Sequence, residues 1–256
     1  MSGGSPSTLF VGQRVIRLDQ VDSTNNFAMG LLKGMPLEEG AVVTTARQTR
    51  GKGQRGNSWE SQPGQNITCS VILRPVFLEP VKQFDLTRAV SLALTDVLLD
   101  IIPQHEVKIK WPNDIFVDDR KIAGILIENI LNGNQLNYSV VGIGLNVNQV
   151  DFISGGAGAT SLRMVTGNAF ELDGILKMIC AAVEVRYLQL RGRKEDKLDE
   201  EYFSRLFKAG ITSKFTDFSA IFEATIVDVT HDGLLVLKDC NGLDRKFAMK
   251  EVGWIG

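Results

Sequence analysis

The chain has 256 residues, of which 44% are hydrophobic and 23% are charged, and these proportions are ordinary for a soluble globular protein of one or two domains. Its formal net charge of -2 argues against a general nucleic-acid-binding protein, because such proteins are usually strongly basic. Three scattered cysteines and two histidines argue against a metal centre built from them, and no apolar stretch is long enough to span a membrane. The first residues lack a signal-peptide pattern, so we expect a cytoplasmic protein.

The first predicted elements are a flexible tail over residues 1–13, a strand over 14–18 and a helix that begins near residue 23 and ends at Gly34. The run Asp22-Ser23-Thr24-Asn25-Asn26 supplies the residue types that cap helices. The same hydroxyl and amide groups at a helix N-terminus could also hold a polar ligand. The pattern alone leaves both interpretations open.

A glycine-rich basic loop, residues 48–59, lies between two predicted strands at 41–45 and 67–73. Glycine lets a backbone approach a ligand closely, and exposed N–H groups beside Lys and Arg make an anion site. A solvated, flexible loop is the alternative interpretation, and the Gly-Lys-Ser/Thr pattern of phosphate loops is absent. The glycines and cations of this loop, with Arg47 just before it, are Arg50, Gly51, Lys52, Gly53, Arg55 and Gly56.

Residues 107 to 148 predict three or four adjacent strands in a mostly antiparallel sheet. A turn at Asp118-Asp119 would put Lys121 at the start of a strand, beside the polar cluster of residues 110–114. The run Gly142-Ile143-Gly144 places glycines inside another predicted strand, which indicates close approach by a ligand or by another backbone.

The rest of the chain divides into helices and a small all-β module. From residue 210 onward, short alternating strands are joined by Asp-Gly and Asn-Gly pairs, which are typical of hairpin turns. The predicted helices are 81–102, 172–190 and 197–207, and the predicted strands of the module are 222–227, 234–237 and 245–249.

These stretches together resemble the motifs of biotin protein ligases, in the same order and nearly from end to end. One departure is Gln54, where the family usually has an arginine. Either Arg55 makes that contact here, or the reactive intermediate is held less strongly. The matching motifs are Ser23-Thr24-Asn25, Arg47 to Trp59, Lys110 to Asp114, Lys121 to Leu126, Gly142 to Asn148, Ala159 to Leu162 and Phe247 to Val252.

The resemblance implies an α+β fold. This fold has a mixed, mostly antiparallel sheet flanked by helices, related to class II tRNA synthetases, followed by a small SH3-like β-barrel. We expect the catalytic domain over residues 14–209 and the barrel over residues 210–256. Larger family members carry an N-terminal DNA-binding domain and act as repressors. Because the resemblance to the catalytic domain begins near residue 14, we expect a monofunctional enzyme that does not bind DNA.

The implied activity is an ATP-dependent ligation in two steps. The carboxylate of biotin attacks the α-phosphorus of ATP to give biotinyl-5′-AMP and pyrophosphate. A lysine of a biotin carboxyl carrier protein, of the acetyl-CoA carboxylase type, then takes the biotinyl group. ATP and Mg²⁺ are the implied cofactors, no membrane partner is expected, and a homodimer is left open. The glycine content of residues 50–58 favours a mobile lid that excludes water from the adenylate.

The resemblance also implies roles for individual residues. Asp114 either helps to hold Mg²⁺ or only braces its turn. The residues expected to be catalytic are Lys121, Lys52 and Arg55. Those expected at biotin are Ser23, Thr24, Asn25, Gln48, Gly51, Lys52, Gly53, Gln54, Lys121 and Gly124. Those expected at ATP are Arg50, Trp59, Lys110, Asn113 and Asn146.

Two other functions compete with this interpretation. A lipoate ligase or an octanoyl transferase would share the scaffold but lacks this basic loop followed by Trp59, and octanoyl transfer needs a nucleophile that we cannot place in the sequence. A non-enzymatic nucleic-acid-binding module would use the basic loop and the β module, against which the acidic pI of about 5.8 argues.

Overall fold

The computed structural model describes residues 8–34, 37–153 and 158–255, which form two β-sheets. The larger sheet consists of β1 (Val15–Val21), β2 (Val42–Gln48), β3 (Ile67–Leu73), β4 (Val107–Lys110), β5 (Asp114–Val117), β6 (Arg120–Asn132) and β7 (Gln135–Leu145). Its strand order is β1-β2-β3-β7-β6-β5-β4, in which β1 and β2 are parallel and every other neighbouring pair is antiparallel. The mixed, mostly antiparallel sheet expected from the sequence is therefore confirmed.

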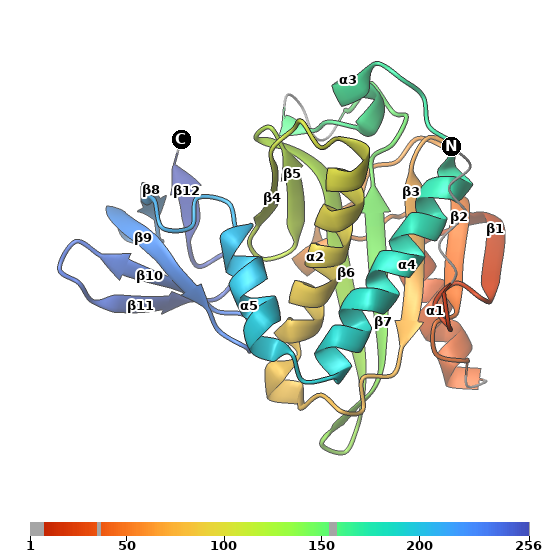
Figure 1. Ribbon diagram of the computed structural model, residues 1–256, viewed down its shortest axis with the longest axis horizontal. Helices are drawn as coiled ribbons and strands as arrows, with labels where there is room; N and C mark the ends of the chain where they lie inside the picture. Colours follow the sequence, from red (N-terminus) through yellow and green to blue (C-terminus); the bar gives the residue numbers. More distant parts are fainter. Residues whose placement is uncertain (1–7, 35–36, 154–157, 256) are drawn as a thin grey trace.

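Helices cover both faces of this sheet. They are α1 (Thr24–Gly34), α2 (Phe84–Ile101), α3 (Leu162–Thr166), α4 (Leu172–Arg191) and α5 (Glu195–Ser204), with the 3₁₀ turns η1 (Gln54–Gly56) and η2 (Pro80–Lys82). The helices α2 and α4 run across one face (Figure 1), whereas α1 packs on β2, β3 and β7 from the other. Successive strand residues point to opposite faces, so Val71 and Val141 join the core with α2, and Ile72 and Val140 join the core with α1.

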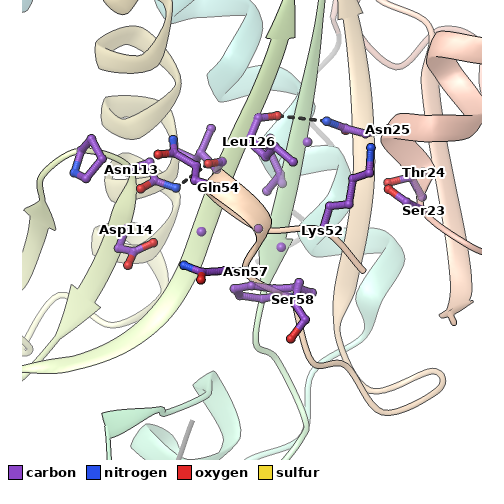
Figure 2. Close-up of a pocket in the computed structure, with 18 of the residues that line it drawn as sticks. Ser23, Thr24, Asn25, Lys52, Gln54, Asn57, Ser58, Asn113, Asp114 and Leu126 are labelled. Carbon is purple, nitrogen blue, oxygen red and sulfur yellow. Dashed lines mark hydrogen bonds between the residues drawn. The ribbon is translucent and has the colours of Figure 1, made fainter. Parts of the chain in front are cut away.

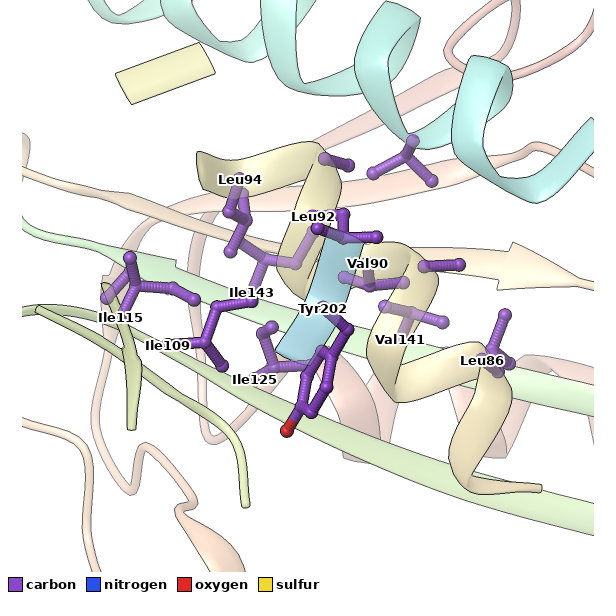
Figure 3. Close-up of a cluster of buried hydrophobic side chains, with 14 of the residues drawn as sticks. Leu86, Val90, Leu92, Leu94, Ile109, Ile115, Ile125, Val141, Ile143 and Tyr202 are labelled. Carbon is purple, nitrogen blue, oxygen red and sulfur yellow. The ribbon is translucent and has the colours of Figure 1, made fainter. Parts of the chain in front are cut away.

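The larger core lies between α2 and the sheet (Figure 3). Val90 and Leu94 of α2 meet Ile125 of β6 and Val141 and Ile143 of β7, and all five side chains are buried. The helix α2 is buried along most of its length, because α4 and α5 also pack against it. Among the helices that the structure describes, none has the length and apolar character needed to cross a membrane.

The smaller sheet lies at the C-terminal end, in agreement with the β module expected from residue 210. It consists of β8 (Thr212–Thr216), β9 (Ile221–Val229), β10 (Leu235–Asp239), β11 (Asp244–Phe247) and β12 (Gly253–Ile255). The strands are antiparallel in the order β11-β10-β9-β8-β12. Gly233 and Gly242 adopt positive φ in the two hairpin turns that the sequence predicts. The strands β8 and β12 are not apparent in the sequence, because β12 has three residues and β8 buries only Phe215.

A buried ion-pair network joins the smaller sheet to α2 and α5. The Arg88 guanidinium lies 2.6 Å from Asp85 Oδ1 and 2.7 Å from Asp199 Oδ1, and it donates a hydrogen bond to the Val229 carbonyl of β9. The two carboxylates and His231 have a spacing that could suit a metal ion, but Arg88 is already their partner. This network fixes the position of the smaller sheet against the helices.

Some boundaries differ from those expected. The helix α2 begins at Phe84 rather than at residue 81, and α5 ends at Ser204 rather than near 207. Residues 9–11, which fall in the predicted flexible tail, donate their backbone N–H groups to the Glu184 carboxylate at 2.7, 2.7 and 2.9 Å. Residues 1–7 of that tail lie outside the described residues, and the domain boundary at 209/210 stays a prediction.

Candidate active site

A cavity of about 240 Å³ lies on the α1 side of the larger sheet, next to the basic loop (Figure 2). Its walls come from the start of α1, the end of β2, the basic loop, and β5, β6 and β7, and Met249 and Lys250 of the C-terminal module reach its edge. The predicted site residues that line it are Ser23, Thr24, Asn25, Gln48, Lys52, Gly53, Gln54, Trp59, Asn113, Asp114, Lys121 and Gly124. Residues that lie far apart in the sequence are therefore brought together as expected.

The wall beside α1 consists of hydrogen-bonded neutral groups. Gln48 Oε1 accepts a hydrogen bond from the Thr24 backbone N–H at 2.8 Å and lies 3.3 Å from the Thr24 hydroxyl. The first N–H groups of a helix have no partner inside it, so Gln48 caps α1. The hydroxyl of Ser70 on β3 extends this hydrogen-bond network, because its Oγ lies 2.8 Å from Thr24 Oγ1. Because Gln48 supplies the cap, the Ser23 hydroxyl, which makes no side-chain hydrogen bond within the described residues, stays available at the cavity.

Asn25 is buried in this wall, and both hydrogens of its amide are used by the protein. Nδ2 donates to the Leu126 carbonyl at 3.2 Å and to Glu128 Oε2 at 2.8 Å, and Oδ1 accepts from Ser70 Oγ at 2.6 Å. A Cβ atom on Gly142 would lie 2.5 Å from Asn25 Oδ1, so this position needs glycine. The close approach indicated by this glycine is therefore made by a side chain, and not by a ligand or another backbone.

The basic loop forms a short hairpin beside the cavity. Gly53 N donates to the Asn57 carbonyl at 2.7 Å, Trp59 N donates to the Gly51 carbonyl at 2.9 Å, and the turn η1 lies between them. A Cβ atom on Gly51 would lie 2.4 Å from the Trp59 carbonyl oxygen, so no side chain fits there. Gly51 thus serves the tight geometry of the loop itself.

The basic loop borders two cavities. Lys52 and Gln54 line the first, and Gln54 Oε1 is buried there with no hydrogen-bond partner among the described residues. Arg50 and Gly51 line an adjoining cavity, which Lys52 also borders. The side chain of Arg55 lies outside the described part of the structure, so its predicted catalytic role and its compensation for Gln54 stay predictions.

Trp59 packs its ring against two glycines of the sheet. A Cβ atom on Gly144 would lie 2.3 Å from Trp59 Cε2, and one on Gly124 would lie 3.1 Å from Cζ3. Lys121 Nζ lies 5.6 Å from the centroid of the ring, within reach of a cation–π interaction. These contacts hold the end of the basic loop on β6 and β7.

Two lysines at the cavity, Lys52 and Lys121, each lie beside a carboxylate. Lys121 Nζ is 2.8 Å from Asp114 Oδ1, and Lys52 Nζ is 3.7 Å from Glu128 Oε1. These four side chains are between 28% and 42% exposed, so solvent screens both pairs and each is weak. A substrate with several negative charges could therefore compete for both lysines. Asp114 is paired with Lys121, and both roles predicted for Asp114, the contact with Mg²⁺ and the bracing of its turn, stay predictions.

Two asparagines expected at ATP brace the strands beside the cavity. Asn113 Nδ2 donates to the Ile125 carbonyl at 2.6 Å, and Asn146 Nδ2 donates to the Thr160 carbonyl at 3.0 Å. Asn146 Oδ1 is buried and has no hydrogen-bond partner among the described residues. Asn146 lines a further cavity together with Trp59 and Lys121, so a free acceptor adjoins the site.

Lys110 is a predicted site residue that the geometry does not bring to these cavities. Its ammonium lies 4.8 Å from the ring centroid of Phe116, 5.8 Å from that of Phe207 and 5.4 Å from that of Trp254. Burial lowers the pKa of Lys110. These cation–π contacts engage its ammonium near the C-terminal module, so the geometry lends no support to its predicted contact with ATP.

Three contributors to the site are not among the predicted site residues: Ser70 and Glu128, which lie outside the motifs, and Met249, which lies in the closing motif, residues 247–252. Ser70 and Glu128 lie on β3 and β6 among apolar residues, where a buried polar group needs a specific partner. Their polarity is a signal that could have drawn attention to them. Met249 reaches the cavity from the distant C-terminal module, and its motif resembles the family without indicating a contact with the site.

Comparison with known proteins identifies relatives of the chain. Residues 18–146 match the model of the biotin/lipoate A/B protein ligase family. The biotin–acetyl-CoA-carboxylase ligase of Paracoccus denitrificans is 34% identical over 172 residues, which cover 64% of this chain and 69% of that protein. The bifunctional ligase/repressor BirA of Bacillus subtilis (strain 168) is 28% identical over 245 residues, which cover 94% of this chain and 74% of that protein.

Solved structures share the fold. The biotin protein ligase from Aquifex aeolicus in complex with biotin and ATP has a TM-score of 0.77 at 24% identity, and the match covers 94% of this chain and 98% of that one. The biotin protein ligase from Leishmania major in complex with biotin has a TM-score of 0.64 at 20% identity, covering 92% and 98%. At these identities the likeness establishes the fold alone.

Proposed function

The chain belongs to the biotin/lipoate A/B protein ligase family, and we propose that it is an ATP-dependent ligase that activates biotin as biotinyl-5′-AMP and transfers the biotinyl group to a carrier protein. Relatives named biotin–acetyl-CoA-carboxylase ligase support a carrier of that carboxylase as the acceptor. One observation carries the proposal: Lys52 and Lys121 reach a single cavity that also has the neutral, hydrogen-bonding wall of Thr24 and Gln48.

This combination suits the two ends of biotin. The ureido ring is neutral and offers both donors and acceptors, which the hydroxyls of Ser23 and Thr24 and the amide of Gln48 can match. The backbone of Gly51 and Lys52 completes that end of the pocket in our proposal. The carboxylate is then directed to Lys121.

In the first step an oxygen of the biotin carboxylate attacks the α-phosphorus of ATP, and pyrophosphate leaves. Two unit charges about 4 Å apart repel each other by about 1 kcal/mol in water and by about 4 kcal/mol near a protein surface. Lys52 and Lys121 offset this repulsion by exchanging Glu128 and Asp114 for substrate oxygens. Catalysis of this kind needs positioned charge and no side-chain nucleophile.

ATP is proposed to extend from the first cavity past Trp59 toward Asn146, whose free Oδ1 could accept a hydrogen bond from the nucleoside. Arg50 and Arg55 are proposed to face the phosphates. Mg²⁺ would enter with the triphosphate as the MgATP substrate. One carboxylate together with phosphate oxygens and water is an ordinary donor set for this ion, and Asp114 could supply that carboxylate.

In the second step the neutral amine of the carrier lysine attacks the acyl carbon of the adenylate, and AMP leaves. Because the adenylate hydrolyses in water, a basic loop that closes over it would protect it.

Met249 and Lys250 line the edge of the cavity, which makes the C-terminal module a candidate contact for the carrier.

A transferase that works through a thioester fits the cavity less well. Cys69 is the cysteine at its lining, and burial strongly raises the pKa of this thiol. A thiol that resists ionisation is a poor nucleophile. Cys69 is therefore poorly suited to act as the nucleophile of the competing octanoyl transferase.

The proposal is tested by incubating the protein with MgATP, a biotin carboxyl carrier domain, and either biotin, lipoate or octanoate. We expect the carrier to gain the mass of one biotinyl group, pyrophosphate to be released, and neither other acid to be transferred. Transfer of lipoate in preference to biotin, or an unmodified carrier with all three acids, would refute the proposed function.

A further inference from the structure

Glu128 is a charged residue on the apolar strand β6, and it lies outside the lining of the cavity that we assign to biotin. Its carboxylate nevertheless contacts two residues that line this cavity. Oε2 accepts a hydrogen bond from Asn25 Nδ2 at 2.8 Å, and Oε1 lies 3.7 Å from Lys52 Nζ. One side chain therefore touches both the neutral wall and the basic loop.

The contact with Asn25 supports the wall. Asn25 is 3% exposed, so its amide hydrogen would have no partner if the Glu128 oxygen were removed. Ser70 donates a hydrogen bond to Asn25 Oδ1 and so fixes the orientation of the amide, and Ser70 in turn contacts Thr24. A rotated Asn25 amide would present a donor where Ser70 now finds an acceptor, so the disturbance would pass to the groups proposed to bind the ureido ring.

The contact with Lys52 acts on the loop. The Lys52 side chain is 42% exposed, and an ion pair of this length and exposure is weak. Such a pair keeps the ammonium near the cavity without trapping it. A phosphate or carboxylate oxygen of a substrate can then displace Glu128 from Lys52.

We propose that Glu128 is a positioning residue that couples the basic loop to the wall beside α1. The identity of the ligand at that wall rests on the proposed function. If Glu128 couples them, the binding of biotin at the wall favours the position in which the basic loop packs beside the cavity. Thermodynamic linkage then requires that loop position to favour biotin binding to the same extent. Glu128 does this through its two oxygens, one on Asn25 and one on Lys52.

The two contacts are separated by two substitutions. Glu128→Gln keeps an acceptor oxygen for Asn25 but removes the charge beside Lys52, whereas Glu128→Ala removes both contacts. By calorimetry, we expect Glu128→Ala to weaken biotin binding by about tenfold or more, and Glu128→Gln to restore it to within about threefold of the unmodified protein. If Glu128→Ala fails to fold, Glu128→Asp takes its place, because the shorter side chain withdraws the carboxylate from Asn25.

The loop contact is measured by tryptic cleavage within residues 50–58 of the protein without biotin. We expect Glu128→Gln to speed this cleavage by up to about fivefold, because an exposed ion pair contributes little more than that factor. Glu106→Gln is the matched control, since Glu106 Oε1 lies 3.6 Å from Lys108 Nζ and neither residue lines the cavity. This control should leave both biotin affinity and cleavage unchanged.

The proposal requires both effects. Unchanged biotin affinity in Glu128→Ala, or unchanged cleavage in Glu128→Gln, would overturn it. If the unmodified protein binds no biotin, the proposed function fails instead, while the cleavage assay still tests the contact between Glu128 and Lys52.

Discussion

Lys121 combines two contacts that bear on its chemistry: the Asp114 carboxylate at 2.8 Å and the Trp59 ring centroid at 5.6 Å. Both keep the ammonium close to the cavity. The expected turn before this lysine is confirmed, because Asp118 and Asp119 adopt the positive φ angles of a tight hairpin turn. The proposed role of Lys121 is to neutralise the carboxylate and α-phosphate as they meet.

We predict that Lys121→Ala lowers pyrophosphate release from biotin and MgATP by about 10²- to 10³-fold, the usual effect of losing one positioned electrostatic group. Folding should be nearly unaffected, because the pair with Asp114 is partly exposed and is worth less than about 1 kcal/mol. Lys177→Ala, at an exposed position on α4, should leave the rate unchanged. Near-normal pyrophosphate release in Lys121→Ala would remove this residue from the mechanism.

Residues such as Ser23, Gln48 and Lys121 could be predicted from the sequence because they lie in motifs that resemble those of a family. Glu128 could not be placed beside Lys52, because that contact depends on how the basic loop folds across β6. The surroundings of the Lys110 ammonium could not be predicted from the sequence either, because its three aromatic neighbours come from separate parts of the chain.

At the scale of elements, the basic loop depends on glycines in the strands beneath it. Trp59 lies directly on Gly144, and Asn25 lies directly on Gly142, so β7 provides a surface without side chains for both. The strand β3 could be predicted with its observed limits because its residues are mostly apolar or β-branched, whereas β8 and β12 are too short and too exposed to stand out.

We predict that Gly144→Ala displaces the Trp59 ring, because the added Cβ would lie 2.3 Å from Cε2 and the rigid ring must move. Overpacking of this kind costs about 1–3 kcal/mol, and we expect it to loosen the basic loop. Tryptic cleavage within residues 50–58 should be faster, and the KM for ATP should rise.

Gly30→Ala is the control for this substitution. Gly30 lies in α1, and a Cβ atom there would meet nothing within 4 Å. It should raise the free energy of unfolding by about 0.5–1 kcal/mol, because alanine suits a helix better than glycine, and should leave loop cleavage unchanged. Equal rates of loop cleavage in the two variants would contradict the proposal that the packing of Trp59 on Gly144 holds the basic loop in place.

At the scale of the whole molecule, Arg88 connects the smaller sheet to the helices of the larger one. Its partners include Asp199 and Val229, which are 111 and 141 residues away in the sequence. The two sheets could be predicted separately, but their docking could not, because nothing in the pattern of either one specifies these partners.

We predict that Arg88→Ala lowers the free energy of unfolding by about 3–5 kcal/mol, because it leaves the buried Asp85 carboxylate without its cation. The matched control is Arg17→Ala, which removes the exposed Arg17–Asp173 pair and should cost less than about 1 kcal/mol. Urea unfolding of the two variants makes the comparison. Similar losses in both would show that the network contributes little to docking.

The central claim is that one cavity brings the biotin carboxylate and the α-phosphate together between a neutral wall and two lysines. A crystal structure of the protein grown with biotin and MgATP tests it most directly. We predict density for biotinyl-5′-AMP, with the ureido ring on Thr24 and Gln48 and the acyl phosphate at Lys121. Biotin bound elsewhere, or a nucleotide remote from Lys121, would contradict the account.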